Sequence, residues 1–181
     1  MSVTVLGIDP GPREHTAAVV THNAPAETAF GTVESVRTGG CDGIPIVWLV
    51  NEHGQAIGHW LHSRLVVLEF PECQGRLRNA WPVHKAAAVL LGRLLDAGCQ
   101  VYTPPSRVIW GAIVGKATAT DTEKLAWLRS QGHQTGKGTP FAHTRTHNVD
   151  AWLAARWGLQ WQTADADARR HHLEPWLEPR S

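Results

Sequence analysis

The chain opens with short apolar runs separated by turn residues, a pattern typical of β-strands. Residues 3–9 are almost all apolar and lead into Asp9-Pro10-Gly11, which predicts a buried strand followed by a tight turn. A β-branched run over 15–21 predicts a second strand, and turn residues at 23–25 separate it from a third over 28–36. We expect these three strands to form two antiparallel hairpins.

Residues 44–62 fit two different structures. The apolar stretches 47–50 and 56–60 flank the polar segment 51–55, as in a hairpin. However, the region also places its apolar residues and one histidine on a single helical face: Ile46, Leu49, Val50, His53, Ile57, Trp60 and Leu61. Gly54 and Gly58 each cost such a helix about 1 kcal/mol. We predict a helix here, with the hairpin as the alternative.

Strands and helices alternate over the rest of the chain until it becomes all helical. The predicted strands are 65–70 and 101–103. The predicted helices run from Trp81 or Pro82 to about Ala97, from a Ser106 cap to about Val114, from an Asp121 or Thr122 cap through Leu128, and from about Asn148 to Trp157. A loop rich in Gly, Thr and His over 132–146 precedes the last helix.

This order of elements predicts an α/β fold with a mixed sheet, helices on its faces and the first strand inside the sheet. The sequence contains no internal repeat and no linker-like stretch between two domains. We therefore expect one domain over residues 1–163 and a polar C-terminal tail over 164–181.

Composition defines the broad class of the protein. The chain has 181 residues, 43% of them hydrophobic, which is enough for one domain with a substantial core. Lys and Arg number 17 against 16 Asp and Glu, and the net charge of +1 neither requires nor excludes nucleic-acid binding. The 3 cysteines have no CxxC spacing, and their odd number favours a reducing environment over a disulfide framework. We expect a cytoplasmic protein that does not bind membranes, since neither a signal peptide nor a membrane-spanning run is visible.

Acidic residues stand where two strands end and where a helix begins. Asp9 follows the first apolar run and Glu69 follows 65–68, positions at which a carboxylate is costly unless a cation offsets its desolvation. His147 and Asp150 are three apart in the sequence, so on a helix they point the same way. Carboxylates favour Mg²⁺ or Mn²⁺, and Mn²⁺ accepts a histidine better. These residues predict a two-metal centre for phosphodiester hydrolysis, in which one ion activates water and the other stabilises the leaving oxygen.

Further segments extend this pattern along the chain. In order they are Leu6-Gly7-Ile8-Asp9-Pro10-Gly11 with Thr16, Val67-Leu68-Glu69, Pro105-Ser106-Arg107-Val108, Val114-Gly115, Asp121 with Lys124, and His147-Asn148-Val149-Asp150-Ala151. Taken together they resemble the RuvC Holliday-junction resolvases, a family of the ribonuclease H-like superfamily. The resemblance runs from residue 3 to about 158.

This resemblance carries specific expectations. It implies a ribonuclease H-like mixed five-stranded sheet with helices on both faces. It also implies an endodeoxyribonuclease, a crossover junction resolvase encoded by a bacterium or a phage, that cuts four-way DNA junctions with two Mg²⁺ or Mn²⁺ ions per site. Asp9, Glu69, His147 and Asp150 would be its catalytic metal ligands. The family dimerises, and a homodimer matches the two-fold symmetry of a four-way junction.

Two features depart from the family pattern. The family often carries an aromatic wedge three residues after the glutamate, and here that position is Glu72. The loop over 132–146 is also longer than the family's.

The basic residues expected to contact phosphates are Arg76, Arg78, Lys85 and Lys124.

Each candidate residue also has an ordinary structural explanation. Asp9 suits a turn, Glu69 a surface charge at a strand end, and Asp150 the N-terminal part of a helix. His147 suits a helix start, and the basic residues suit solvated helix surfaces.

The alternative functions are a nuclease for other branched DNA or RNA-containing substrates, and a junction-binding protein without catalysis. A sugar-kinase-like or actin-like protein shares the Gly-x-Asp-x-Gly pattern but needs two such domains, for which 181 residues are too few.

Overall fold

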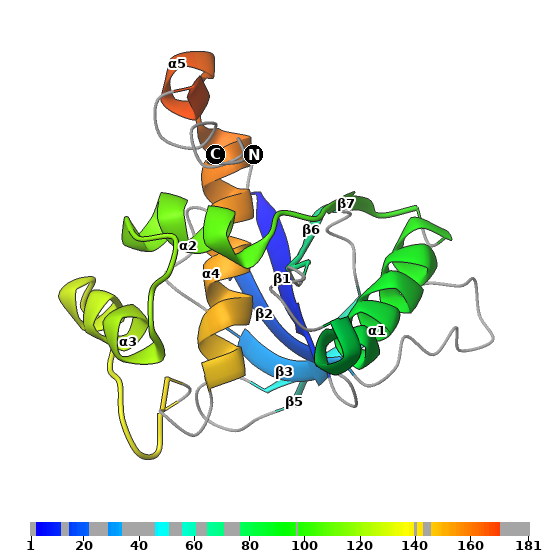
Figure 1. Ribbon diagram of the computed structural model, residues 1–181, viewed down its shortest axis with the longest axis horizontal. Coiled ribbons are helices and arrows are strands. Elements are labelled where there is room, and N and C mark those ends of the chain that lie inside the picture. Colours follow the sequence, from blue (N-terminus) through cyan, green and yellow to red (C-terminus); the bar gives the residue numbers. More distant parts are fainter. Residues whose placement is uncertain are drawn as a thin grey trace.

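The computed structural model describes residues 3–11, 15–21, 29–33, 46–50, 56–60, 65–70, 77–96, 98–139, 141–142 and 146–170; within 15–60 and 77–80 it describes the backbone only. A seven-stranded sheet in the order β5-β4-β3-β2-β1-β6-β7 forms its centre (Figure 1). The strands are β1 (Thr4–Pro10), β2 (His15–Thr21), β3 (Ala29–Val33), β4 (Ile46–Val50), β5 (Ala56–Trp60), β6 (Leu65–Leu68) and β7 (Gln100–Tyr102).

The first strand lies inside the sheet, between an antiparallel and a parallel neighbour. β1 pairs antiparallel with β2, which pairs antiparallel with β3, so the two predicted hairpins are confirmed. On its other side β1 pairs parallel with β6, and β6 pairs parallel with β7. Parallel pairing puts the carboxyl ends of β1 and β6 at the same edge, which is where Asp9 and Glu69 were predicted to meet.

The predicted helix over 46–61 is wrong, and with it the expectation of five strands. β4 and β5 form a hairpin with a register from Ile46↔Trp60 to Val50↔Ala56, and β4 joins the edge of β3. Ile46, Val47 and Val50 are β-branched and favour extended backbone, while Gly58 weakens a helix. As a hairpin, this segment forms backbone hydrogen bonds with β3. The spacing of apolar residues in the sequence does not show that such pairing is available.

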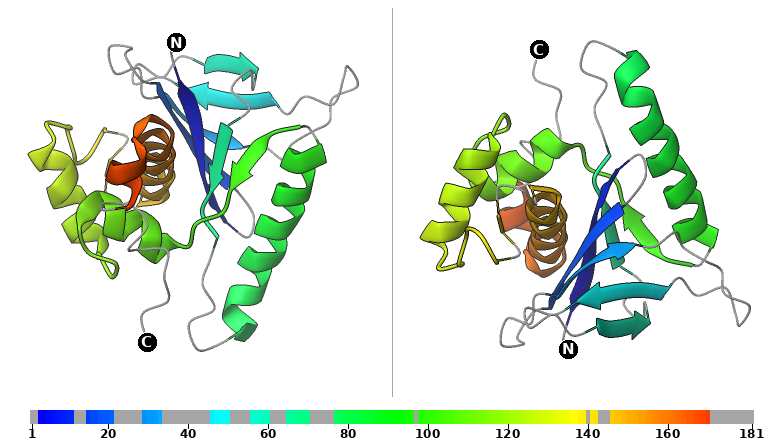
Figure 2. Two further views of the ribbon diagram at one scale, coloured as in Figure 1. Left: turned by 90° about the horizontal axis from the view of Figure 1, so that it is seen from above. Right: turned by 90° about the horizontal axis from the view of Figure 1, so that it is seen from below.

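Helices cover both faces of the sheet, as expected. α1 (Leu77–Asp96) lies on one face, and α2 (Ser106–Val114), α3 (Asp121–Ser130) and α4 (Thr146–Thr163) lie on the other (Figure 2). The short α5 (Ala166–Ala168) follows α4. None of the helices in the described ranges is long and apolar enough to cross a membrane.

Two helix starts differ from the prediction. α1 begins four residues before Trp81, so Pro82 lies inside the helix, where it removes one backbone hydrogen bond. α3 is capped by Thr120, whose hydroxyl accepts from the Glu123 backbone N–H while the Glu123 carboxylate accepts from the Thr120 N–H. This reciprocal capping box places the cap at Thr120, one residue before the predicted Asp121, and α3 begins at Asp121.

α4 packs directly on the backbone of β1. A Cβ atom added to Gly7 would lie 2.0 Å from the Ala151 carbonyl oxygen and 2.3 Å from the Ala155 nitrogen. Further along the helix, a Cβ at Gly158 would lie 2.4 Å from Val67 Cγ2. Small residues on both elements therefore set a short distance between α4 and the sheet. This close packing holds the start of α4, with His147 and Asp150, beside the end of β1.

Candidate active site

Glu69 is a buried carboxylate directly after β6. Its backbone N–H donates to the Ile8 carbonyl at 2.9 Å, which ties it to the end of β1. Its side chain is only 7% exposed. The Ser106 hydroxyl donates to Oε1, whereas Oε2 is buried and has no hydrogen-bond partner among the described residues. One oxygen of Glu69 is thus held by the protein and the other is left without a donor.

The environment of Glu69 strongly disfavours its charge. Burial, followed by the negative charges of Asp9 and Asp150, raises the pKa of Glu69 from 4.5 to about 8, although Ser106 and Lys124 act in the opposite direction. A buried carboxyl facing two other carboxylates needs either a proton or a cation. Near neutral pH the Glu69 carboxyl therefore holds a proton unless a cation takes its place.

Asp150 lies in the first turns of α4 and receives two donors on the same oxygen. Lys124 Nζ donates to Oδ1 at 2.8 Å, and the Trp110 indole N–H donates to Oδ1 at 3.1 Å. Burial raises the pKa of Asp150 to about 6, against the opposing effect of Lys124. Asp150 is thus anchored through Oδ1 while its charge remains costly.

His147 occupies the second position of α4 and reaches Asp9 at the end of β1. Its Nδ1 lies 2.6 Å from Asp9 Oδ2, and its side chain is 72% exposed. The hydrogen bond to Asp9 is the largest cause that holds the pKa of His147 above 6.5, and burial opposes it. In this arrangement His147 and Asp9 bind each other.

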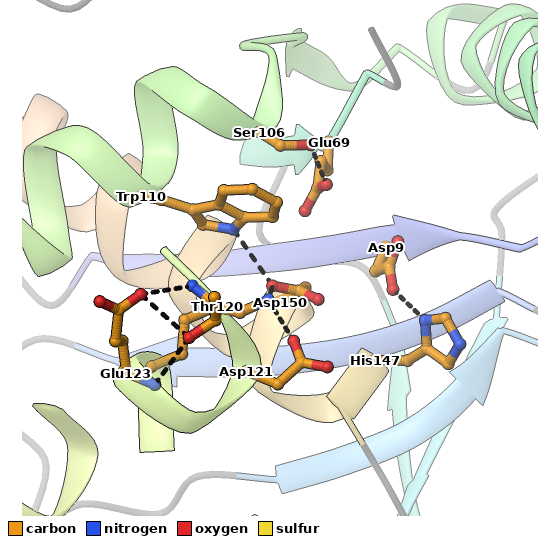
Figure 3. Close-up of polar contacts among 10 residues, drawn as sticks. Asp9, Glu69, Ser106, Trp110, Thr120, Asp121, Glu123, His147 and Asp150 are labelled. Carbon is orange, nitrogen blue, oxygen red and sulfur yellow. Dashed lines mark hydrogen bonds and ion pairs between the residues drawn. The ribbon is translucent and has the colours of Figure 1, made fainter. Parts of the chain in front are cut away.

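The four predicted site residues thus surround one region of the molecule, where β1 and β6 end and α4 begins (Figure 3). Within the described residues, however, no three His, Cys, Asp or Glu side chains converge tightly enough to form a ready metal cluster. The donor set nevertheless suits hard divalent ions, since it combines three carboxylates with one imidazole. It also includes a buried oxygen, Glu69 Oε2, that no described residue contacts by a hydrogen bond. Asp9 and His147 would have to exchange their mutual hydrogen bond for bonds to an ion.

The four basic residues predicted to contact DNA are placed differently. Lys124 is 3% exposed, and its Nζ forms ion pairs of 2.8 Å with both Asp121 and Asp150. Burial lowers the pKa of Lys124, but these two carboxylates outweigh it and raise the pKa above 10.5. Lys85 is exposed on α1. Arg78 lies in α1 without a described side chain, and Arg76 lies outside the described residues.

Two residues that contact the carboxylates were not among the predicted site residues. Ser106 was predicted as a helix cap, but Pro105 occupies the cap position and the Ser106 hydroxyl serves Glu69 instead. Trp110 was not predicted as a site residue, because its contact with Asp150 joins residues 40 positions apart. The i, i+4 spacing of Ser106 and Trp110 on one helix was the available clue.

The sheet order, the helices on both faces and this edge of the sheet together define a RuvC-like α/β fold. In particular, the chain is similar to a structure of Thermus thermophilus RuvC, with 18% identity and a TM-score of 0.51, over 90% of this chain and 99% of that one. It is also similar to T. thermophilus RuvC in complex with a Holliday junction substrate, with 17% identity and a TM-score of 0.54, over 90% of this chain and 98% of that one. No protein-family model and no curated protein matches the sequence. The resemblance inferred from the motifs is confirmed at the level of the fold.

Proposed function

We propose that this chain is a metal-dependent endonuclease that hydrolyses phosphodiester bonds at four-way DNA junctions. The observation that carries the proposal is the buried Glu69 carboxyl group, which faces Asp9 and Asp150 and has one oxygen without a partner among the described residues. Support for the substrate comes from the fold, which is similar to a RuvC bound to a Holliday junction substrate.

Asp9, Glu69, His147 and Asp150 are the residues that would hold two Mg²⁺ or Mn²⁺ ions. When bound, such ions supply an activated water and stabilise the charge that develops on the leaving oxygen. To bind these ions, the carboxyl groups of the site must lose their protons, and the His147 imidazole must be neutral. Glu69 has its free oxygen already buried at the site, whereas the exposed His147 lies on the solvent side.

A homodimer is part of this proposal. Two copies related by a two-fold axis present two identical sites, which matches the symmetry of a four-way junction. Lys85, which is exposed on α1, would contact phosphates together with Arg76 and Arg78, whereas the buried Lys124 would act within the active site.

The test is a cleavage assay with purified protein on a synthetic four-way junction, a flap, a linear duplex and an RNA–DNA hybrid. With Mg²⁺ or Mn²⁺, we expect the junction to be cut in preference to the other substrates. EDTA should abolish cleavage. Ca²⁺ should support binding without cleavage, because it takes more ligands in a looser geometry. Equal cleavage of all four substrates would limit the proposal to a general nuclease, and full activity in EDTA would overturn it.

A further inference from the structure

One face of α2 carries two hydrogen-bond donors, and each reaches a different carboxylate of the site. Ser106 and Trp110 are one helical turn apart, so their side chains leave the helix in the same direction (Figure 3). Ser106 donates to Glu69 Oε1, and the Trp110 indole N–H donates to Asp150 Oδ1 at 3.1 Å. A packing role alone does not require either hydrogen bond.

Each donor engages one oxygen and leaves the other. At Glu69 the remaining oxygen is buried and has no protein donor among the described residues. At Asp150 the second donor, Lys124, also goes to Oδ1 and adds no bond to Oδ2. A carboxylate held through one oxygen keeps a fixed orientation for the other, which lowers the entropy lost when that other oxygen binds an ion.

The indole of Trp110 also supports Lys124. The Lys124 ammonium lies 4.4 Å from the centre of the Trp110 ring, a cation–π distance. Trp110, Lys124 and Asp150 therefore form a closed triangle in which each member contacts the other two. Because α2 and α3 supply the donors and α4 supplies the acceptor, the triangle also fixes these helices relative to one another.

We propose that Ser106 and Trp110 are positioning residues, which orient Glu69 and Asp150 so that one oxygen of each faces the divalent ions. The inference rests on the proposed metal-dependent function. In this arrangement α2 orients both carboxylates, although it contributes none of the four proposed metal ligands.

The experiment measures Mn²⁺ binding without DNA, by electron paramagnetic resonance of the free ion, for the wild type, Ser106→Ala and Trp110→Phe. Phe keeps an aromatic ring but removes the N–H together with the five-membered ring of the indole, a loss of volume that the Trp157→Phe control shares. Ala suits the first turn of a helix. Each variant should bind Mn²⁺ on the order of 10-fold more weakly, the size typical for residues that orient metal ligands. Cleavage should fall at low Mn²⁺ and recover as Mn²⁺ is raised, because the ligands themselves remain.

Matched controls separate positioning from general packing. Trp157→Phe alters a buried tryptophan whose indole N–H has no partner among the described residues. Ser130→Ala removes a hydroxyl that donates to the Trp127 carbonyl and accepts from the Gln131 side-chain amide. Both should bind Mn²⁺ within about twofold of the wild type, with each fold checked by circular dichroism. If Trp110→Phe does not fold, Ser106→Ala alone decides the outcome for α2.

The Mn²⁺-binding measurements test the positioning role of Ser106 and Trp110 separately from the proposed metal-dependent function. A wild type that binds no Mn²⁺ would overturn the proposed function. A wild type that binds Mn²⁺, with Ser106→Ala and Trp110→Phe equal to it, would overturn the positioning role and leave the function standing. Equal weakening by Trp157→Phe would also overturn it, because the effect would then be one of packing.

Discussion

At the scale of single residues, the four proposed ligands differ in how the fold holds them. Glu69 is held through one oxygen by a donor from α2, and Asp150 is held through one oxygen by donors from α2 and α3. Asp9 and His147 instead bind each other. The first pair is therefore oriented before any ion arrives, and the second pair has to rearrange. This difference gives substitutions in the two pairs distinct consequences.

Asp9→Asn should abolish cleavage and leave junction binding largely intact. The substitution removes a ligand charge with little change in shape, while phosphate contacts made elsewhere supply most of the affinity. Cleavage in Mg²⁺ and gel-shift binding in Ca²⁺ would be measured side by side. Loss of binding or of folding together with activity would mean that Asp9 has a structural role.

His147→Asp should keep substantial activity and His147→Ala should lose most of it, because an aspartate supplies a ligand oxygen at the same helix position. The imidazole must be neutral to bind an ion, and its hydrogen bond to Asp9 raises its pKa above 6.5. Wild-type cleavage should therefore decline as the pH falls toward and below neutrality, whereas the aspartate variant should remain active at lower pH. Rates measured against pH for the three proteins check this. An active alanine variant with an unchanged profile would remove His147 from the site.

At the scale of elements, the sequence predicted those parts of the fold that depend on local pattern. The apolar run into Asp9 and the run into Glu69 gave β1 and β6 and placed both carboxylates at strand ends. The hairpin of β4 and β5 was missed because its apolar residues also share a helical face, and only pairing with β3 decides between the two. The hydrogen bonds of Ser106 and Trp110 to the carboxylates were missed because their partners lie 37 and 40 residues away.

Gly7→Ala should damage the site without touching a ligand. Its Cβ would fall 2.0 Å from a backbone oxygen of α4, so the helix that carries His147 and Asp150 must move away from β1. We expect a loss of about 1–3 kcal/mol of stability, typical of overpacking, together with weaker metal binding. Denaturant unfolding and Mn²⁺ titration measure both effects.

Gly92→Ala is the matched control for Gly7→Ala. A Cβ at Gly92 meets nothing within 4 Å, and alanine favours a helix interior over glycine by roughly 0.5–1 kcal/mol. This variant should therefore be as stable as the wild type or slightly more stable. A Gly7→Ala protein of wild-type stability would show that β1 and α4 are less tightly packed than the geometry indicates.

At the scale of the whole molecule, the titratable groups of the candidate site make the free energy of unfolding depend on pH. Folding raises the pKa of Glu69 to about 8 and that of Asp150 to about 6, and it also raises the pKa of His147. Through these three groups the folded protein holds more protons than the unfolded chain between about pH 5 and pH 8. They outweigh the smaller opposite effect of His133, whose pKa is lowered by burial and by the charge of Arg156. All three groups act in the same direction, so the free energy of unfolding should fall as the pH rises through this range.

The last prediction is that divalent ions reverse this fall. Thermal unfolding in EDTA should show Tm decreasing from about pH 5 to pH 8. The range begins at about pH 5 because the exposed Glu123, whose pKa is lowered to about 2, has the opposite effect on stability at lower pH. Saturating Mg²⁺ should raise Tm more at pH 8 than at pH 5, because ions replace the protons that the carboxyl groups have lost. Glu69→Gln should flatten the decline in EDTA and reduce the gain from Mg²⁺, since it removes the group with the most strongly raised pKa. A Tm that rises with pH in EDTA, or an equal gain from Mg²⁺ at both pH values, would contradict the assignment of these buried carboxyl groups to a cation site.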